Sequence, residues 1–235
     1  MKKETLKNDL VLACKIIVNQ QLDSGPFGNV SVRMPSQDQF LINPAGRVFE
    51  QLELDDILCV DLNGKVMEGK QAAPHPGEFI HREIYRLRHD IQAIVHTHSE
   101  HTVLMSLLDQ SIEPFTQLGA SIFGDQGIYH GFTGPVRTSE EGLAIAKALG
   151  NKSIVIAKNH GLFTTGPTLS SALWDMIIAN QASKIHIKAK QMGLSQADNL
   201  SKESVQKSKR EVRDQQHQWM WEVLRQRVKF LAVHS

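Results

Sequence analysis

The sequence predicts a single-domain α/β fold around a largely antiparallel sheet. The chain has 235 residues, of which 41% are apolar, which is enough to bury one substantial core. The first third contains short segments of alternating apolar and polar residues separated by turn residues, a pattern typical of antiparallel strands. Beyond this region, segments with helical spacing alternate with short apolar strands, as in α/β proteins.

Apolar residues at helical spacing predict a first helix over residues 6–22. We expect the helix to end before the Asp-Ser-Gly-Pro sequence at residues 23–26, since glycine and proline do not continue a helix. The two cysteines, Cys14 and Cys59, lie in apolar sequence and form no Cys-x-x-Cys pair. We therefore interpret both as reduced core residues.

Three strands are predicted in the next part of the chain. In the first, Val30 and Val32 alternate with polar residues, and residues 40–43 and 57–61 have strand-like composition. Asn63-Gly64 is a typical hairpin turn. This region is therefore expected to form antiparallel β-structure.

The sequence after the first third predicts alternating helices and strands. A helix should begin near Pro76-Gly77, and the buried strand that follows should run into His96-Thr97-His98. Thr138 and Glu141 fit a capping box, so a helix should run from there to Gly150. A strand over residues 153–157, a turn over 159–161 and a long helix over 168–192 follow.

The end of the chain consists of a polar segment and a terminal helix. The segment as far as residue 218 is rich in lysine, glutamine and serine and carries no evident chemistry. Apolar residues between Trp219 and Leu231 predict a helix that packs on its own core or on a neighbouring subunit.

Charge and the N-terminal sequence limit the classes of partner. The chain has 26 basic and 25 acidic residues, so no general positive field attracts nucleic acid or an anionic membrane. The first residues lack the apolar region of a secretory signal, and no apolar run is long enough for a membrane helix. We expect a cytoplasmic protein whose partners are small molecules or copies of itself.

Three histidines are candidate metal ligands. Residues two apart in a strand point to the same side, so His96 and His98 can share one cation. This pair alone could equally be hydrogen-bonded histidines at the end of a strand. His160 follows another buried strand and precedes Gly161, where backbone can approach closely. Three imidazoles with an open fourth position are typical of a catalytic zinc site.

The sequence resembles the class II aldolase/adducin family over about residues 5–195, with residues 196–235 as a polar segment and C-terminal helix. Three motifs carry the resemblance in order: Gly28-Asn29-Val30-Ser31-Val32-Arg33, the segment from Ile80-His81 to His96-Thr97-His98, and Lys158-Asn159-His160-Gly161-Leu162. The resemblance implies a three-layer α/β/α fold with a central, largely antiparallel sheet. It also implies zinc (Zn2+) on His96, His98 and His160, and a homotetramer with active sites at subunit interfaces.

The implied activity is that of a carbon–carbon lyase. In this family a zinc-stabilised enolate allows aldol cleavage or decarboxylation of a small hydroxy-carbonyl or hydroxy-acid substrate. The resemblance implies Glu78 as general base and acid, and Gly28, Asn29 and Gly46 as substrate-binding residues. The alternatives are an adducin-like, non-catalytic binding protein and a sugar-phosphate epimerase of the same family.

Three features of the site depart from the family pattern. Gly77 occupies the place of the family's catalytic acid, so either the helix start has shifted by one residue or the acid is lost. Ala45-Gly46 and His75-Pro76 stand where fuculose-phosphate aldolases have phosphate-binding hydroxyls, so a carboxylate is as plausible a ligand as a phosphate. Arg47 or His75 could neutralise either anion. The tyrosine that protonates the leaving fragment aligns with Gln117, and Tyr129 and His130 lie nearby in the sequence.

The other histidines and two loop charges have simpler interpretations. His101 either lines the site or faces solvent, and His81 is expected to be structural. His186 and His217 lie in polar helical sequence and are expected at the surface. Asp125 and Arg137 either contact the substrate or are solvated loop charges.

Overall fold

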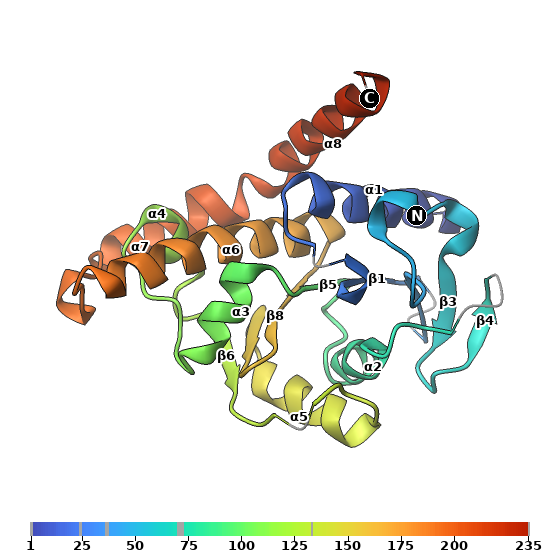
Figure 1. The fold of residues 1–235 in the computed structure, drawn as a ribbon, viewed down its shortest axis with the longest axis horizontal. Helices are drawn as coiled ribbons and strands as arrows, with labels where there is room; N and C mark the ends of the chain where they lie inside the picture. The colour runs from blue at the N-terminus through green and yellow to red at the C-terminus, as the bar shows by residue number, and fades with distance from the viewer. Residues whose placement is uncertain (1, 24, 36–37, 70–72, 133, 235) are drawn as a thin grey trace.

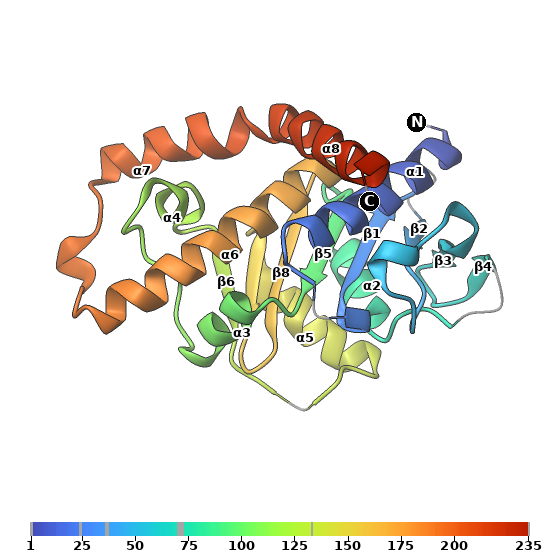
Figure 2. The ribbon, with the colours of Figure 1, turned by 45° about the horizontal axis from the view of Figure 1, so that its top comes forward.

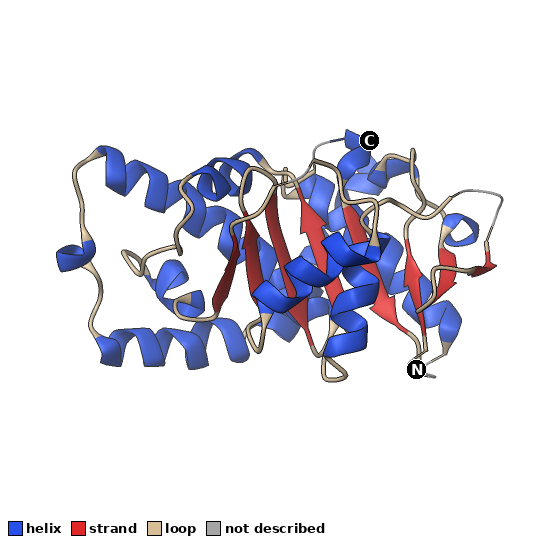
Figure 3. Cartoon of the chain, turned by 90° about the horizontal axis from the view of Figure 1, so that it is seen from below, coloured by secondary structure: helices blue, strands red, loops and turns tan. Residues whose placement is uncertain are grey.

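The computed structural model describes residues 2–23, 25–35, 38–69, 73–132 and 134–234, with the side chains of 231–234 left out. Within these residues, eight strands form one sheet with the order β4-β3-β2-β1-β5-β8-β7-β6. Figure 3 shows the strands side by side with helices around them. All neighbouring strands are antiparallel except β6 and β7, which are parallel. The strands are β1 (Asn29–Arg33), β2 (Gln39–Ile42), β3 (Leu58–Asp61), β4 (Val66–Glu68), β5 (Ala93–Thr97), β6 (Gln126–Tyr129), β7 (Ile154–Ala157) and β8 (Gly161–Gly166).

Helices cover both faces of the sheet, which gives the expected three layers (Figure 1). One face carries α2 and α5, and the other carries α1, α3 and α6. Each face buries its own apolar cluster, so the core consists of two layers on either side of the sheet. The helices are α1 (Lys3–Asn19), α2 (Glu78–Leu87), α3 (Glu100–Leu107), α4 (Gln117–Ile122), α5 (Ser139–Leu149), α6 (Leu169–Gln191), α7 (Lys202–Ser208) and α8 (His217–His234).

The turns and caps expected from the sequence are confirmed. Gly64 has a φ of 87° in the turn between β3 and β4. The side chains of Thr138 and Glu141 form a reciprocal capping box at the start of α5, and Gly150 caps its end. Cys14 and Cys59 are both buried and free. The first helix ends at Asn19, three residues earlier than expected, and Gln21 then adopts a φ of 55°.

Strand β1 is polar on the face that meets α2. Asn29, Ser31 and Arg33 point to this face, and all three are buried. The Ser31 hydroxyl lies 2.7 Å from both the Tyr85 hydroxyl and Nδ1 of His81. The Arg33 guanidinium donates to the carbonyl oxygens of Tyr85, Arg88 and Ile91. Directional hydrogen bonds, as well as apolar packing, therefore hold α2 against the sheet.

The polar segment after α6 is folded onto the domain. It contains α7 and a π-helix over Lys209–Asp214, and both contact α4. Trp174 Nε1 on α6 donates to the carbonyl oxygen of Val212, 3.0 Å away. Arg213 donates to both carboxylate oxygens of Asp175 on α6, at 2.8 and 2.6 Å, and to Asp125 at 2.5 Å. Asp125 is therefore a structural ion-pair partner of Arg213.

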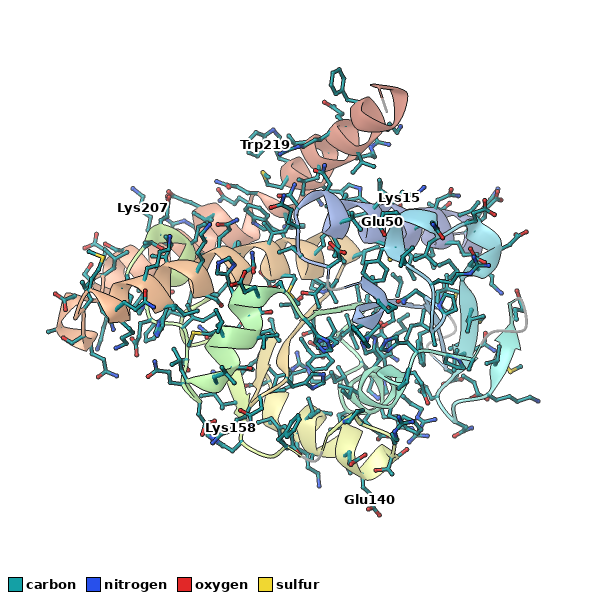
Figure 4. The ribbon with its side chains drawn as sticks, viewed as in Figure 1. Lys15, Glu50, Glu140, Lys158, Lys207 and Trp219 are labelled. Carbon is teal, nitrogen blue, oxygen red and sulfur yellow. The ribbon has the colours of Figure 1, made fainter. Side chains whose placement is uncertain are left out.

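Helix α8 then runs back past α6 and α1 (Figure 2). Among the described side chains of α8, Leu224 is buried, whereas Trp219 is 63% exposed and its side chain points away from the other helices (Figure 4). Phe230, on the same face of the helix as Trp219, is 61% exposed. In the described part of the chain, no helix has the length and apolar character needed to cross a membrane.

Candidate metal centre

His96, His98 and His160 converge at one end of the central strands. His96 lies in β5, His98 follows the end of that strand, and His160 lies in the turn between β7 and β8. One ligand nitrogen from each of the three side chains falls within 4.8 Å of the others. The structure therefore brings together the three histidines that the sequence singled out.

The ring of His96 has a defined orientation and tautomer. Nδ1 of His96 donates to the carbonyl oxygen of Leu162 at 2.8 Å, which leaves the Nε2 lone pair facing the centre. The Nε2 atoms of His96 and His98 are 2.8 Å apart. Histidine ligands of metals commonly donate their second N–H to a carbonyl in this way.

Burial keeps the three imidazoles neutral. It lowers the pKa of His98 and, together with His98 and His75, lowers the pKa of His160 to about 4. For His96, burial and then the neighbouring His98 and His160 lower the pKa well below its ordinary value. Neutral imidazole is the form that binds a metal, so the three lone pairs are available near neutral pH.

The backbone beside His160 has the close approach expected from its glycine. Asn159 and Gly161 have φ angles of 58° and 143°, both in the left-handed region. A Cβ atom on Gly161 would lie 3.2 Å from the carbonyl oxygen of Thr97 and 3.6 Å from the ring of His98. The tight turn therefore lets His160 approach the other two histidines.

The donor set fits a divalent metal. Three neutral imidazole nitrogens face one point, one ring is held by a backbone carbonyl, and the centre opens into a cavity. Such a set is typical of catalytic zinc sites, in which the substrate or water takes the remaining position.

A cavity of about 680 Å³ adjoins the three histidines. Two of the expected substrate-binding residues, Asn29 and Gly46, line it, together with His75 and Arg137. Asn29 lies directly opposite His96 in the pairing of β1 with β5. Gly28 is buried against Phe49 and is not among the described lining residues.

Glu78 lies at the start of α2 but is not among the described residues that line the cavity. It is 6% exposed, and its Oε1 is 3.6 Å from Nη1 of Arg82. Its Oε2 is buried without a hydrogen-bond partner, and burial raises the pKa of the carboxyl group. Gly77 lines the cavity in its place. The structure does not bring Glu78 to the histidines, and its role as base stays a prediction.

His186 is not at the surface, so that expectation was wrong. It is 1% exposed, and its Nδ1 accepts a hydrogen bond from the backbone N–H of Glu113 at 2.9 Å. His217 is half-buried and donates to the carbonyl oxygen of Asp214. The loop that precedes α4 covers the side of α6 on which His186 lies, which the polar sequence around His186 does not indicate.

The remaining candidates are not part of the cluster of His96, His98 and His160. His81 is fully buried against Ser31, and burial lowers its pKa to about 3. Arg47 and His101 do not line the cavity among the described residues, and Arg47 lies 3.6 Å from Asp56.

Tyr129 lines a small hollow next to His160, whereas His130 is exposed and contacts Asp109. Gln117 begins α4.

The sequence did not identify the apolar walls of the cavity. Phe27 and Phe132 line it although they are 58% and 54% exposed, and Val103 lies on α3. Both phenylalanines lie next to glycine in loop sequence, in Gly25-Pro26-Phe27-Gly28 and Gly131-Phe132. A large apolar residue in such a loop is unusual, and this pattern could have predicted an exposed aromatic side chain at a binding site.

Comparisons with known proteins identify the family of this chain. The sequence model of the Class II Aldolase and Adducin N-terminal domain matches residues 8–187. The chain is 33% identical over 174 residues to L-fuculose phosphate aldolase from Escherichia coli, covering 74% of this chain and 79% of that protein. It is 30% identical over 171 residues to the decarboxylase NovR from Streptomyces niveus, covering 72% of this chain but only 63% of that protein.

A solved structure extends the likeness to nearly the whole chain. L-fuculose 1-phosphate aldolase from Glaciozyma antarctica matches with a TM-score of 0.87 and 26% identity, covering 99% of this chain and 91% of that one. On the sequence match, the fold and the histidine motifs together, the chain belongs to the class II aldolase and adducin family.

Proposed function

We propose that this protein is a zinc-dependent carbon–carbon lyase acting on a small hydroxy-carbonyl or hydroxy-acid compound. The convergence of His96, His98 and His160 within 4.8 Å at a cavity carries the proposal. A zinc ion held by these residues would act as a Lewis acid and stabilise negative charge on the substrate oxygens.

The protein's own residues would position the substrate. Asn29 lies opposite His96, and the exposed Gly46 with its φ of 70° forms part of the cavity wall. Gly28 precedes Asn29 in the chain, and its lack of a side chain makes room for Phe49. Val103 and Phe132 line the cavity, and their apolar side chains would help exclude water from the reacting group.

Aldol cleavage and decarboxylation both fit this proposal. One relative is named as an aldolase and another as a decarboxylase, and each reaction develops negative charge beside a carbonyl group. Proton transfer by Glu78 would require its carboxylate to turn from Arg82 toward the cavity.

A non-catalytic, adducin-like binding protein is the second candidate. One observation favours it: no aspartate or glutamate is among the described residues that line the cavity. Retention of all three histidines, with His96 oriented by Leu162, favours the enzyme.

Metal analysis separates the two candidates. We expect about one zinc ion per chain in the purified protein, and loss of that ion in His96→Ala. His101→Ala is the matched control, because His101 lies outside the histidine cluster, and it should retain the ion. Purified protein that takes up no zinc would exclude the lyase. Zinc-loaded protein should then be screened for cleavage of hydroxy-aldehydes, sugar phosphates and hydroxy-carboxylates.

We further propose a cytoplasmic homotetramer in which residues 5–195 form the catalytic domain and residues 196–235 support it or a neighbour. The exposed Trp219 and Phe230 on one face of α8 support an association surface there. Sedimentation of the protein and of Trp219→Glu tests this, with a reduced mass expected for the variant.

A further inference from the structure

The start of α2 is capped by His75. The backbone N–H of Gly77 donates to Nδ1 of His75 at 3.1 Å, and the N–H of Glu78 donates to the carbonyl oxygen of His75 at 2.8 Å. N–H groups at the start of a helix attract anions because they carry partial positive charge. Here both groups already have an acceptor from the chain itself.

The amide of Asn29 is engaged by the same imidazole. Its Nδ2 donates to Nδ1 of His75 at 3.1 Å, and its buried Oδ1 has no hydrogen-bond partner. Asn29 is 0% exposed, and a Cβ atom on Gly77 would lie 2.5 Å from its Nδ2. Asn29, His75 and Gly77 are thus packed together in the cavity wall.

This arrangement leaves the wall poorly suited to a phosphate group. On this part of the wall, the donors that face an incoming anion are the N–H of Gly77 and the amide of Asn29, and both are directed at His75. Burial lowers the pKa of His75 to about 4, so the ring is neutral near pH 7 and offers no charge to an anion.

The rest of the cavity is mainly apolar. Phe27, Ile80, Val103, Phe132 and Val136 line it, and Arg137 is the one lysine, arginine, aspartate or glutamate among its described lining residues. Such a cavity suits a ligand with an apolar body and at most one anionic group, such as a carboxylate.

We propose that His75 determines substrate specificity by filling the anion-binding corner formed by Asn29 and Gly77. The substrate is accordingly an unphosphorylated hydroxy-carbonyl or hydroxy-acid compound with an aromatic or aliphatic body. The hydroxy-carbonyl or hydroxy-acid group of the substrate rests on the proposed function. The role of His75 rests only on the contacts in the cavity wall.

Binding of inorganic phosphate, measured by titration calorimetry, tests the role of His75. In His75→Ser the shorter side chain frees both donors, and we expect phosphate to bind roughly tenfold more tightly than to the wild type, as two hydrogen bonds to an anion allow. His75→Asn keeps an acceptor atom near the position of Nδ1 and should behave as the wild type. His89→Ser, at an exposed position on the chain, is the control for loss of a histidine.

The titration is made on chelator-treated and zinc-loaded protein, which distinguishes failure of this inference from failure of the proposed function. A gain seen only with zinc would mean that phosphate binds the ion, and it would overturn the role of His75. Equal phosphate affinity of His75→Ser and wild type would also overturn it. Absence of zinc binding overturns the lyase but does not affect the chelator-treated comparison.

A second measurement needs no variant. Zinc-loaded wild-type protein is titrated with phenyllactate and with phosphoglycerate, two hydroxy-acids that differ in having an aromatic body or a phosphate. We expect phenyllactate to bind roughly tenfold more tightly, because the phosphate would lack donors in the wall. Equal or tighter binding of phosphoglycerate would overturn the proposal.

Discussion

The imidazole ring of His96 lies parallel to the phenyl ring of Phe163, with the ring centroids 3.8 Å apart and an interplanar angle of 6°. The two residues are paired across β5 and β8, so both rings leave the same face of the sheet. Since the preceding residue of β8, Leu162, supplies the acceptor for Nδ1, neighbouring positions of one strand fix both the tilt and the rotation of His96.

Replacing Phe163 should loosen this ligand without unfolding the protein. For Phe163→Leu we expect a loss of about 1 kcal/mol in the free energy of unfolding, typical of a hydrophobic exchange of similar volume. Zinc affinity should fall roughly tenfold, as it does when support of a ligand is lost. Competition with a chelator measures it. Phe40→Leu, in the same apolar cluster, is the control and should keep full zinc affinity.

The variant Glu78→Gln tests whether Glu78 is the general base, as the sequence implied, or only a partner of Arg82, as its contacts indicate. Because the carboxylate is held beside Arg82 outside the cavity wall, we expect zinc content and turnover within about threefold of the wild type, whereas loss of a general base typically costs 10²-fold or more. Turnover is measured on a substrate identified by screening. Glu83→Gln is the matched variant, since it removes a second buried carboxylate from the same helix. A hundredfold loss confined to Glu78→Gln would establish Glu78 as the base.

Arg213→Ala should destabilise the C-terminal segment strongly. The variant leaves Asp175, which is 4% exposed, without its bidentate partner, and breaking a buried pair in this way costs about 3–5 kcal/mol. Urea unfolding measures the loss. Arg210→Ala removes an arginine from the same π-helix, and we expect a change of under about 0.5 kcal/mol because that side chain is exposed. Similar losses in the two variants would contradict the importance of the pair.

His186 should make stability dependent on pH. Burial, followed by the charge of Lys190, lowers its pKa below the ordinary value, so between the two values the unfolded chain binds more protons than the folded one. Its contribution is therefore complete above about pH 6.5 and is lost as the pH falls toward the folded-state pKa. In His186→Gln we expect a shallower fall in the free energy of unfolding between pH 7 and 5. The exposed His89→Gln should follow the wild type, and an unchanged slope in His186→Gln would contradict the assignment.

Local sequence predicted most of the fold because local interactions determine those elements. The capping box at Thr138 and the turn at Gly64 each depend on residues within three or four positions. The histidines His96 and His98 were equally predictable, since strand geometry alone places them on one side. His160 needed the resemblance as well, because its approach depends on the pairing of β7 with β8.

The features that were missed depend on contacts between distant segments. The polar composition of residues 196–218 does not show that Arg213 pairs with Asp175, 38 positions earlier. The burial of His186 depends on Gln110 and Glu113, 76 and 73 positions earlier. Whether the Glu78 side chain faces the cavity depends on where α2 begins relative to Asn29. The spacing between Glu78 and the histidines in the sequence does not determine the direction of this side chain.

The polar face of β1 has a consequence for how reliably the chain finds its native pairing. A shift of β1 by one residue would turn Asn29, Ser31 and Arg33 to the opposite side of the sheet. The Arg33 guanidinium would then enter the apolar cluster beneath α1 and α6 and lose its three carbonyl acceptors, while Val30 and Val32 would face Tyr85 and His81. A sheet with β1 in this shifted register would be much less stable than the native sheet. The strand that supports the metal centre therefore also selects the correct register of the sheet during folding.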